Sequence, residues 1–98
     1  MALEIVWTIQ AEKGLDRVIN YLEDNWTSKE ILNLEKNIDD LIKRISKFPK
    51  ICPATSKYKN LRKGLVDKNN YIIYRIKPRK KVIEIVNFRG TRQKPLNH

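Results

Sequence analysis

A helix start that falls almost where another helix stops is the feature that most constrains this chain. Residues 27–30 read Thr-Ser-Lys-Glu, a capping box in which Thr27 and Glu30 satisfy each other's backbone donors. Apolar side chains then recur in a near-heptad seam: Ile31, Leu34, Ile38, Leu41, Ile45 and Phe48. Pro49 ends this helix, because proline cannot continue one.

Another helix directly precedes the capping box. Thr8 offers an N-cap oxygen, and the helix is expected to run to about Asn25. Its apolar positions recur at helical spacing: Leu15, Val18, Ile19, Leu22 and Trp26. Because the connection between the two helices is so short, they are predicted to form an antiparallel hairpin.

Strands are expected on either side of this hairpin. The opening residues alternate, with Leu3, Ile5 and Trp7 on one side. A loop follows the helices over residues 49–57, and it leads to three strands at about 60–66, 71–76 and 81–88. Their turns are expected at 67–70, where the residues tolerate positive φ, and at 78–80.

The order strand-helix-helix-strand-strand-strand predicts an α+β fold, in which a helical hairpin packs on one face of a small, mostly antiparallel sheet. A chain of 98 residues is expected to form a single domain over residues 1–98. In the middle of the three later strands, alternation turns Ile72, Tyr74 and Ile76 toward the helices. The opposite, open face then receives Tyr71, Ile73, Arg75 and Lys77.

The two neighbouring strands are assigned in the same way. Arg62 is expected on the open face, opposite to Leu61 and Leu65. The strand at 81–88 is apolar on both sides, which makes its facing ambiguous. We expect Ile83 and Ile85 to face the helices. The open face would then carry Glu84, Val86 and Phe88.

Charge divides the sequence into two unlike parts. Residues 1–40 hold four basic and nine acidic side chains, whereas residues 41–98 hold seventeen basic and two acidic ones, within a total net charge of +10. We therefore expect most acidic side chains in the helical layer and most basic side chains in the sheet and its loops. An asymmetry of this size indicates a polyanionic or acidic partner for the second part.

Several classes of protein are excluded. The one cysteine, Cys52, rules out an internal disulfide and favours a reducing, cytoplasmic location. With one cysteine and the single histidine His98, a Cys/His zinc site cannot form, and a nucleophile activated by histidine is disfavoured. No apolar run approaches the length of a bilayer span, so no membrane partner is expected. Neither a metal nor a cofactor is expected.

The whole chain resembles the RelE/ParE-type toxins of type II toxin-antitoxin systems, often labelled plasmid stabilisation proteins. The stretches that carry the resemblance are Val6-Trp7-Thr8, Tyr21-Leu22-Glu23-Asp24-Asn25-Trp26, Phe48-Pro49, Lys59-Asn60-Leu61-Arg62-Lys63, Tyr71-Ile72-Ile73-Tyr74-Arg75-Ile76 and Arg89-Gly90-Thr91-Arg92-Gln93-Lys94-Pro95. The resemblance implies a growth-arresting toxin with a cognate antitoxin as its partner. RelE-like members cut mRNA on the ribosome and ParE-like members poison DNA gyrase, so the resemblance leaves the target open.

Ribosome-dependent mRNA cleavage is the first of the functions expected. Metal-free RNA cleavage needs a general base, a general acid and cations for the developing charge. The candidate catalytic residues are Lys59, Arg62, Arg75 and Arg92. The candidate RNA-binding residues are Lys57, Lys63, Tyr71 and Arg89. The general base stays open between Glu84 and a lysine crowded by arginines.

Two alternatives remain beside the endoribonuclease. RelE-like members often place a tyrosine or histidine near the chain's end, whereas residues 88–92 read Phe-Arg-Gly-Thr-Arg, and this departure counts against RNA cleavage. A non-enzymatic toxin that inhibits gyrase needs no such residue. A decayed toxin that binds only its antitoxin or nucleic acid is the third possibility. Independently of these functions, the aliphatic stems of Arg62 and Arg75 could simply cover an apolar sheet face.

Overall fold

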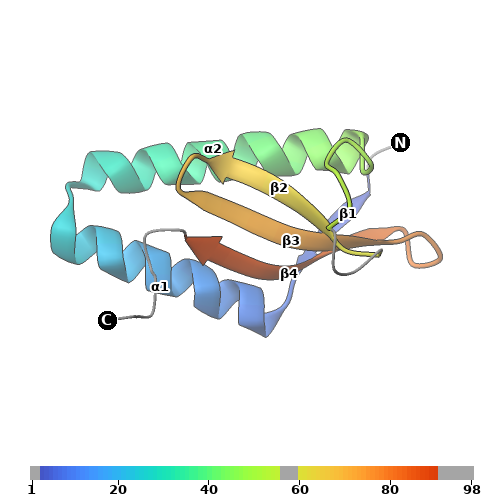
Figure 1. Ribbon diagram of the computed structural model, residues 1–98, viewed down its shortest axis with the longest axis horizontal. Helices are drawn as coiled ribbons and strands as arrows, with labels where there is room; N and C mark the ends of the chain where they lie inside the picture. The colour runs from blue at the N-terminus through green and yellow to red at the C-terminus, as the bar shows by residue number, and fades with distance from the viewer. Residues whose placement is uncertain (1–2, 56–59, 91–98) are drawn as a thin grey trace.

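A computed structural model describes residues 3–55 and 60–90, and its elements follow the predicted order (Figure 1). The elements are β1 (Glu4–Trp7), α1 (Ile9–Asn25), α2 (Ser28–Lys47), β2 (Arg62–Asp67), β3 (Asn70–Lys77) and β4 (Val82–Gly90). Within the described residues the strands form a four-stranded sheet in the order β1-β4-β3-β2. Only β1 and β4 pair in parallel, which confirms the mostly antiparallel α+β fold.

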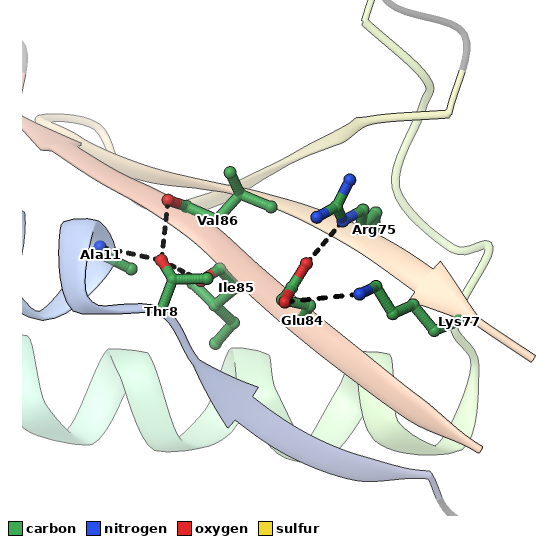
Figure 2. A network of polar contacts seen from close by, with 7 residues as sticks. All are labelled: Thr8, Ala11, Arg75, Lys77, Glu84, Ile85 and Val86. Atoms are coloured by element: carbon green, nitrogen blue, oxygen red, sulfur yellow. Dashed lines mark hydrogen bonds and ion pairs between the residues drawn. The ribbon is translucent and has the colours of Figure 1, made fainter. Parts of the chain in front are cut away.

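Both predicted helix starts are confirmed. The Thr8 hydroxyl oxygen accepts a hydrogen bond from the Ala11 N–H at 3.1 Å, and the hydroxyl proton is shared between the carbonyl oxygens of Ile85 and Val86, each at 3.0 Å (Figure 2). Thr8 therefore fastens the start of α1 to β4. At α2 the Thr27 N–H donates to the Glu30 carboxylate at 3.1 Å, which completes the capping box.

The core lies between the hairpin and one face of the sheet. The helices contribute Ala11, Val18, Leu22, Leu34, Ile38, Leu41 and Ile45. The strands contribute Ile72, Tyr74, Ile83, Ile85 and Phe88. α1 packs chiefly on β4 and α2 on β2, so the two helices cover the same face and leave the other open. Tyr74 is fully buried, and its hydroxyl donates to the Pro49 carbonyl at 2.8 Å, which ties the loop after α2 to β3.

The side chain of Phe88 lies on the face of the sheet opposite to the one predicted for it. Along β3 and β4, Ile73 is paired with Asn87 but Tyr74 with Ile85, so Val86 is an extra residue in β4. Such a β-bulge reverses the alternation beyond it. Phe88 consequently points toward the helices and is 1% exposed, whereas it was expected on the open face. The expectation for Ile83 and Ile85, which precede the bulge, is confirmed.

The turn at 67–70 is confirmed, but another mechanism closes it. None of its residues has a positive φ, and among the described non-glycine residues only Lys81, at the end of the β3–β4 turn, does so (φ 58°). The Asp67 carboxylate instead accepts hydrogen bonds from the Asn69 N–H at 2.7 Å and from the Asn70 side chain at 3.1 Å. A side chain thus replaces the left-handed backbone that the sequence suggested.

Candidate functional site

The open face of the sheet is the surface that the helical hairpin leaves uncovered. β3 places Tyr71, Ile73, Arg75 and Lys77 there, as predicted, because its alternate residues Ile72 and Tyr74 are buried against the helices. The pairing of β3 with β4 adds Glu84, Asn87 and Arg89, and its pairing with β2 adds Lys63 and Leu65. The charged and aromatic side chains on this face fall into two clusters.

The Arg75 cluster consists of Arg75, Lys77 and Glu84. Arg75 and Glu84 lie opposite each other across β3 and β4, and Arg75 Nε donates to Glu84 Oε1 at 2.5 Å (Figure 2). Lys77 Nζ lies 3.6 Å from the other carboxylate oxygen. The hydrogen bond from Arg75, together with the two nearby positive charges, lowers the pKa of Glu84 below its ordinary value. Glu84 therefore holds two cations in place and leaves the cluster with one net positive charge.

This arrangement predicts a pH dependence of stability. A lowered folded-state pKa means that the Glu84 interaction stabilises the protein above the ordinary glutamate pKa of about 4.5 and is lost as the pH falls through the lowered value. For a partly exposed pair the contribution is about 0.5–1 kcal/mol. Urea unfolding should therefore find Glu84→Gln less stable than the wild type by that amount at pH 7, and the difference should shrink as the pH falls through the lowered pKa of Glu84.

The matched control is Glu35→Gln, since Glu35 is an exposed glutamate of α2. It should change the free energy of unfolding by less than Glu84→Gln at pH 7. Equal effects of the two substitutions, or a difference for Glu84→Gln that persists in acid, would contradict the assigned role of Glu84.

The Tyr71 cluster consists of Lys63, Tyr71 and Arg89. Lys63 Nζ lies 4.3 Å from the centroid of the Tyr71 ring, a cation-π contact, and Arg89 is paired with Tyr71 across the strands. All three were candidate RNA-binding residues, and the sheet brings them together. Two of them, Tyr71 and Arg89, also line a hollow on the open face.

This hollow has a volume of about 530 Å³. Its lining residues are Thr55, Leu61, Tyr71, Ile73, Val86, Asn87 and Arg89. The Asn87 side-chain oxygen is buried and has no hydrogen-bond partner among the described residues. Sequence reasoning missed Asn87, because only the bulge at Val86 turns it to the open face.

The Arg62 side chain lies on the face of the sheet that the helices cover. The prediction that it lies on the open face is wrong. It is paired with Tyr74, so its side chain shares the face of that buried residue. Arg62 Nη1 donates to the Cys52 carbonyl at 2.6 Å. Arg62 and Arg75 are therefore not brought together, and Arg62 fastens the loop after α2 to β2. Burial raises the pKa of the neighbouring Tyr74 above its ordinary range.

The remaining candidates are Lys57, Lys59 and Arg92, and they lie outside the described residues. Within residues 3–55 and 60–90, no group of three or more histidine, cysteine or acidic side chains is placed to hold a metal ion. No helix in the same part of the chain is both long enough and apolar enough to cross a bilayer. The open face can thus offer a partner cations held by neighbouring side chains and an aromatic ring.

Solved structures share this fold. The chromosomal ParDE toxin-antitoxin system from P. aeruginosa is similar with a TM-score of 0.73 at 16% identity, over 91% of this chain and 96% of that one. A YoeB/ParE toxin from Agrobacterium tumefaciens gives a TM-score of 0.65 at 14% identity, over 90% and 98%. The RelBE2 toxin-antitoxin complex from Mycobacterium tuberculosis is similar with a TM-score of 0.65 at 13% identity, over 92% of this chain and 99% of that one.

A search of curated proteins found no match to this sequence. A family model does match it, over residues 5–95, and that model describes the ParE toxin of the type II toxin-antitoxin system parDE. The match spans nearly all of the chain, and the element order and sheet agree with the similar structures. The chain therefore belongs to the ParE toxin family and is the toxin component of a type II toxin-antitoxin system, with a cognate antitoxin as its partner.

Proposed function

We propose that this toxin arrests growth by binding DNA gyrase in the cytoplasm through the open face of its sheet, and not by cleaving mRNA. The family match favours the ParE kind, to which the resemblance attributes gyrase poisoning. The observation that carries the proposal is the state of Glu84, whose carboxylate is held by Arg75 and Lys77.

A ribonuclease of this fold needs a general base on the open face. Glu84 was one of the two options for that base, but its lowered pKa makes it a weaker proton acceptor. Arg62, expected beside Arg75 as a second cation for the phosphate, is directed toward the helices instead. The open face therefore suits binding better than acid-base chemistry.

Binding to gyrase needs no catalytic pair, only a surface of stable shape and charge. The Arg75 cluster is held by ion pairs across β3 and β4, so its side chains lose little freedom on binding. The Tyr71 cluster adds two more cations beside the 530 Å³ hollow. Positive charge on one face also raises the rate of encounter with an enzyme that holds DNA.

Inhibition of supercoiling tests this proposal. Purified toxin should prevent gyrase from supercoiling a relaxed plasmid. Arg75→Ala should raise the toxin concentration needed for half inhibition at least tenfold, because it removes a cation and frees Glu84 to repel an anionic partner. The matched control is Arg79→Ala, an exposed arginine in the β3–β4 turn, and it should change that concentration by less than threefold.

Induction in growing cells supplies the opposing test. Gyrase inhibition leaves translated messages intact, and protein synthesis initially continues. If synthesis stops first and messages carry cuts that Arg75→Ala abolishes, the ribonuclease alternative holds, with Lys59, Arg75 and Arg92 as the remaining catalytic candidates. If the wild type neither inhibits supercoiling nor cuts messages, the chain is a decayed toxin and the proposal is wrong.

A further inference from the structure

An exposed apolar surface adjoins the edge of the open face, where the loop after α2 meets the edge strand β2, and Lys63 of the Tyr71 cluster lies on its border. Phe48, Ile51 and Leu65 are 62%, 51% and 66% exposed, although all three are large apolar side chains. We call these three residues the apolar edge patch. Contiguous exposed apolar surface on a small protein commonly marks an interface with another macromolecule.

Two shallow hollows give this patch its shape. The first, of about 690 Å³, is lined by Lys47, Phe48, Pro49, Lys50, Ile51 and Ile76. The second, of about 440 Å³, is lined by Arg44, Ile51, Cys52, Pro53, Lys63 and Leu65. They meet at Ile51, so the patch is a continuous surface with two places for an incoming side chain.

The charges around the patch all have one sign. Arg44, Lys47, Lys50 and Lys63 line the hollows, and no acidic side chain of the described residues does so. A second copy of this chain would bring the same cations against these, within a net charge of +10. Like charges across an interface are costly, so the occupant is a partner with acidic residues around an apolar anchor.

We infer that the apolar edge patch is an anchor for the antitoxin, which places an apolar side chain of a short acidic segment against Ile51 and its carboxylates against Lys47 and Lys50. Apolar surface of this kind is typical of long-lived rather than transient complexes. The cognate antitoxin is the protein partner that the family membership of this chain supports. This inference does not depend on whether the target is gyrase.

Two leucines of nearly equal exposure provide a matched test. Leu65 lies in the patch and is 66% exposed, and Leu32 lies on α2 and is 65% exposed. Affinity for the antitoxin encoded in the same operon is measured by isothermal titration with purified toxin variants. Leu65→Glu and Ile51→Glu should each weaken binding at least tenfold, whereas Leu32→Glu should change it by less than twofold.

The basic rim is tested by reversing its charge. Lys50→Glu should weaken antitoxin binding severalfold at low salt, with a smaller effect at high salt, because a rim charge acts through screened attraction. The control is Lys36→Glu, an exposed lysine of α2, which should have little effect. Circular dichroism melts of each variant separate loss of binding from loss of folding.

Three results would overturn the inference. Leu65→Glu could weaken antitoxin binding no more than Leu32→Glu does. The patch variants could keep full antitoxin affinity but lose growth arrest, which would assign the surface to the target. The wild-type toxin could form a dimer in sedimentation experiments that Ile51→Glu dissociates, which would assign it to a second copy.

Discussion

Replacing Phe88 with alanine should lower the free energy of unfolding by about 3–5 kcal/mol, the cost typical of removing a buried phenyl ring. Phe88 is 1% exposed, and its ring stacks on Trp7 with 6.4 Å between ring centroids. The substitution leaves a cavity where α1, β1 and β4 meet. Urea unfolding followed by tryptophan fluorescence and circular dichroism measures the change.

Val86→Ala is the matched comparison, because the sequence alone placed Val86 and Phe88 on the same side of the strand. Val86 is the bulged residue and lies on the rim of the open-face hollow. Its substitution should cost less than about 1 kcal/mol, the usual range for a partly exposed position. If Phe88→Ala and Val86→Ala lowered the free energy of unfolding by similar amounts, the position assigned to the bulge would be wrong.

Replacing Gly14 with alanine should destabilise the protein by about 2 kcal/mol, although alanine is the better helix former. Helix propensity by itself favours alanine over glycine by about 1 kcal/mol. A Cβ on Gly14, however, would lie 2.2 Å from the Phe88 carbonyl oxygen. Overpacking against backbone costs about 3 kcal/mol, since no rotamer change relieves it, and this exceeds the gain in propensity. Chemical unfolding of the two proteins measures the difference.

Gly64→Ala is the control that tests whether the clash with backbone causes the loss of stability in Gly14→Ala. A Cβ at Gly64 would meet the side chains of Cys52 at 3.2 Å and Leu41 at 3.4 Å, and side chains can move. The loss there should stay below about 1 kcal/mol. If Gly14→Ala proves neutral or stabilising, the close approach of α1 to β4 is wrong.

Local signals in the sequence predicted the elements and their order correctly. The capping box at Thr27 and Glu30, the N-cap Thr8 and the helix end before Pro49 all depend on residues within a few positions of one another. The facing of β3 was predictable for the same reason, since alternation needs only the strand itself. The family was recognisable because these local signals stand in a characteristic order.

The errors came from pairing between strands. Alternation along β2 alone predicts Arg62 on the open face. In the sheet Arg62 is paired with Tyr74, whose side chain is buried against the helices, so the Arg62 side chain lies on that face too. The prediction for Phe88 was wrong because the bulge at Val86 is a property of two strands together. Neither feature leaves a mark in one segment of sequence, since both depend on which residues of a neighbouring strand lie opposite.

The candidate site shows the same division. The sequence supplied the positive charge of the second part of the chain and named Lys63, Tyr71, Arg75 and Arg89, which the sheet does place on its open face. It could not show that Glu84 neutralises part of that charge, or that Asn87 lines the hollow. Those contacts join side chains from different strands, so they exist only after the strands pair.

By itself, then, this sequence determined the helical hairpin, the α+β class, the family and the separation of acidic from basic residues, because each depends on local patterns or on composition. Only the tertiary structure decided which arginine reaches the open face, what holds it there, and that Phe48, Ile51 and Leu65 adjoin as one exposed surface. The physical reason is that registers, bulges and surface patches arise from residues distant in the chain, and packing selects among the arrangements that local preferences allow.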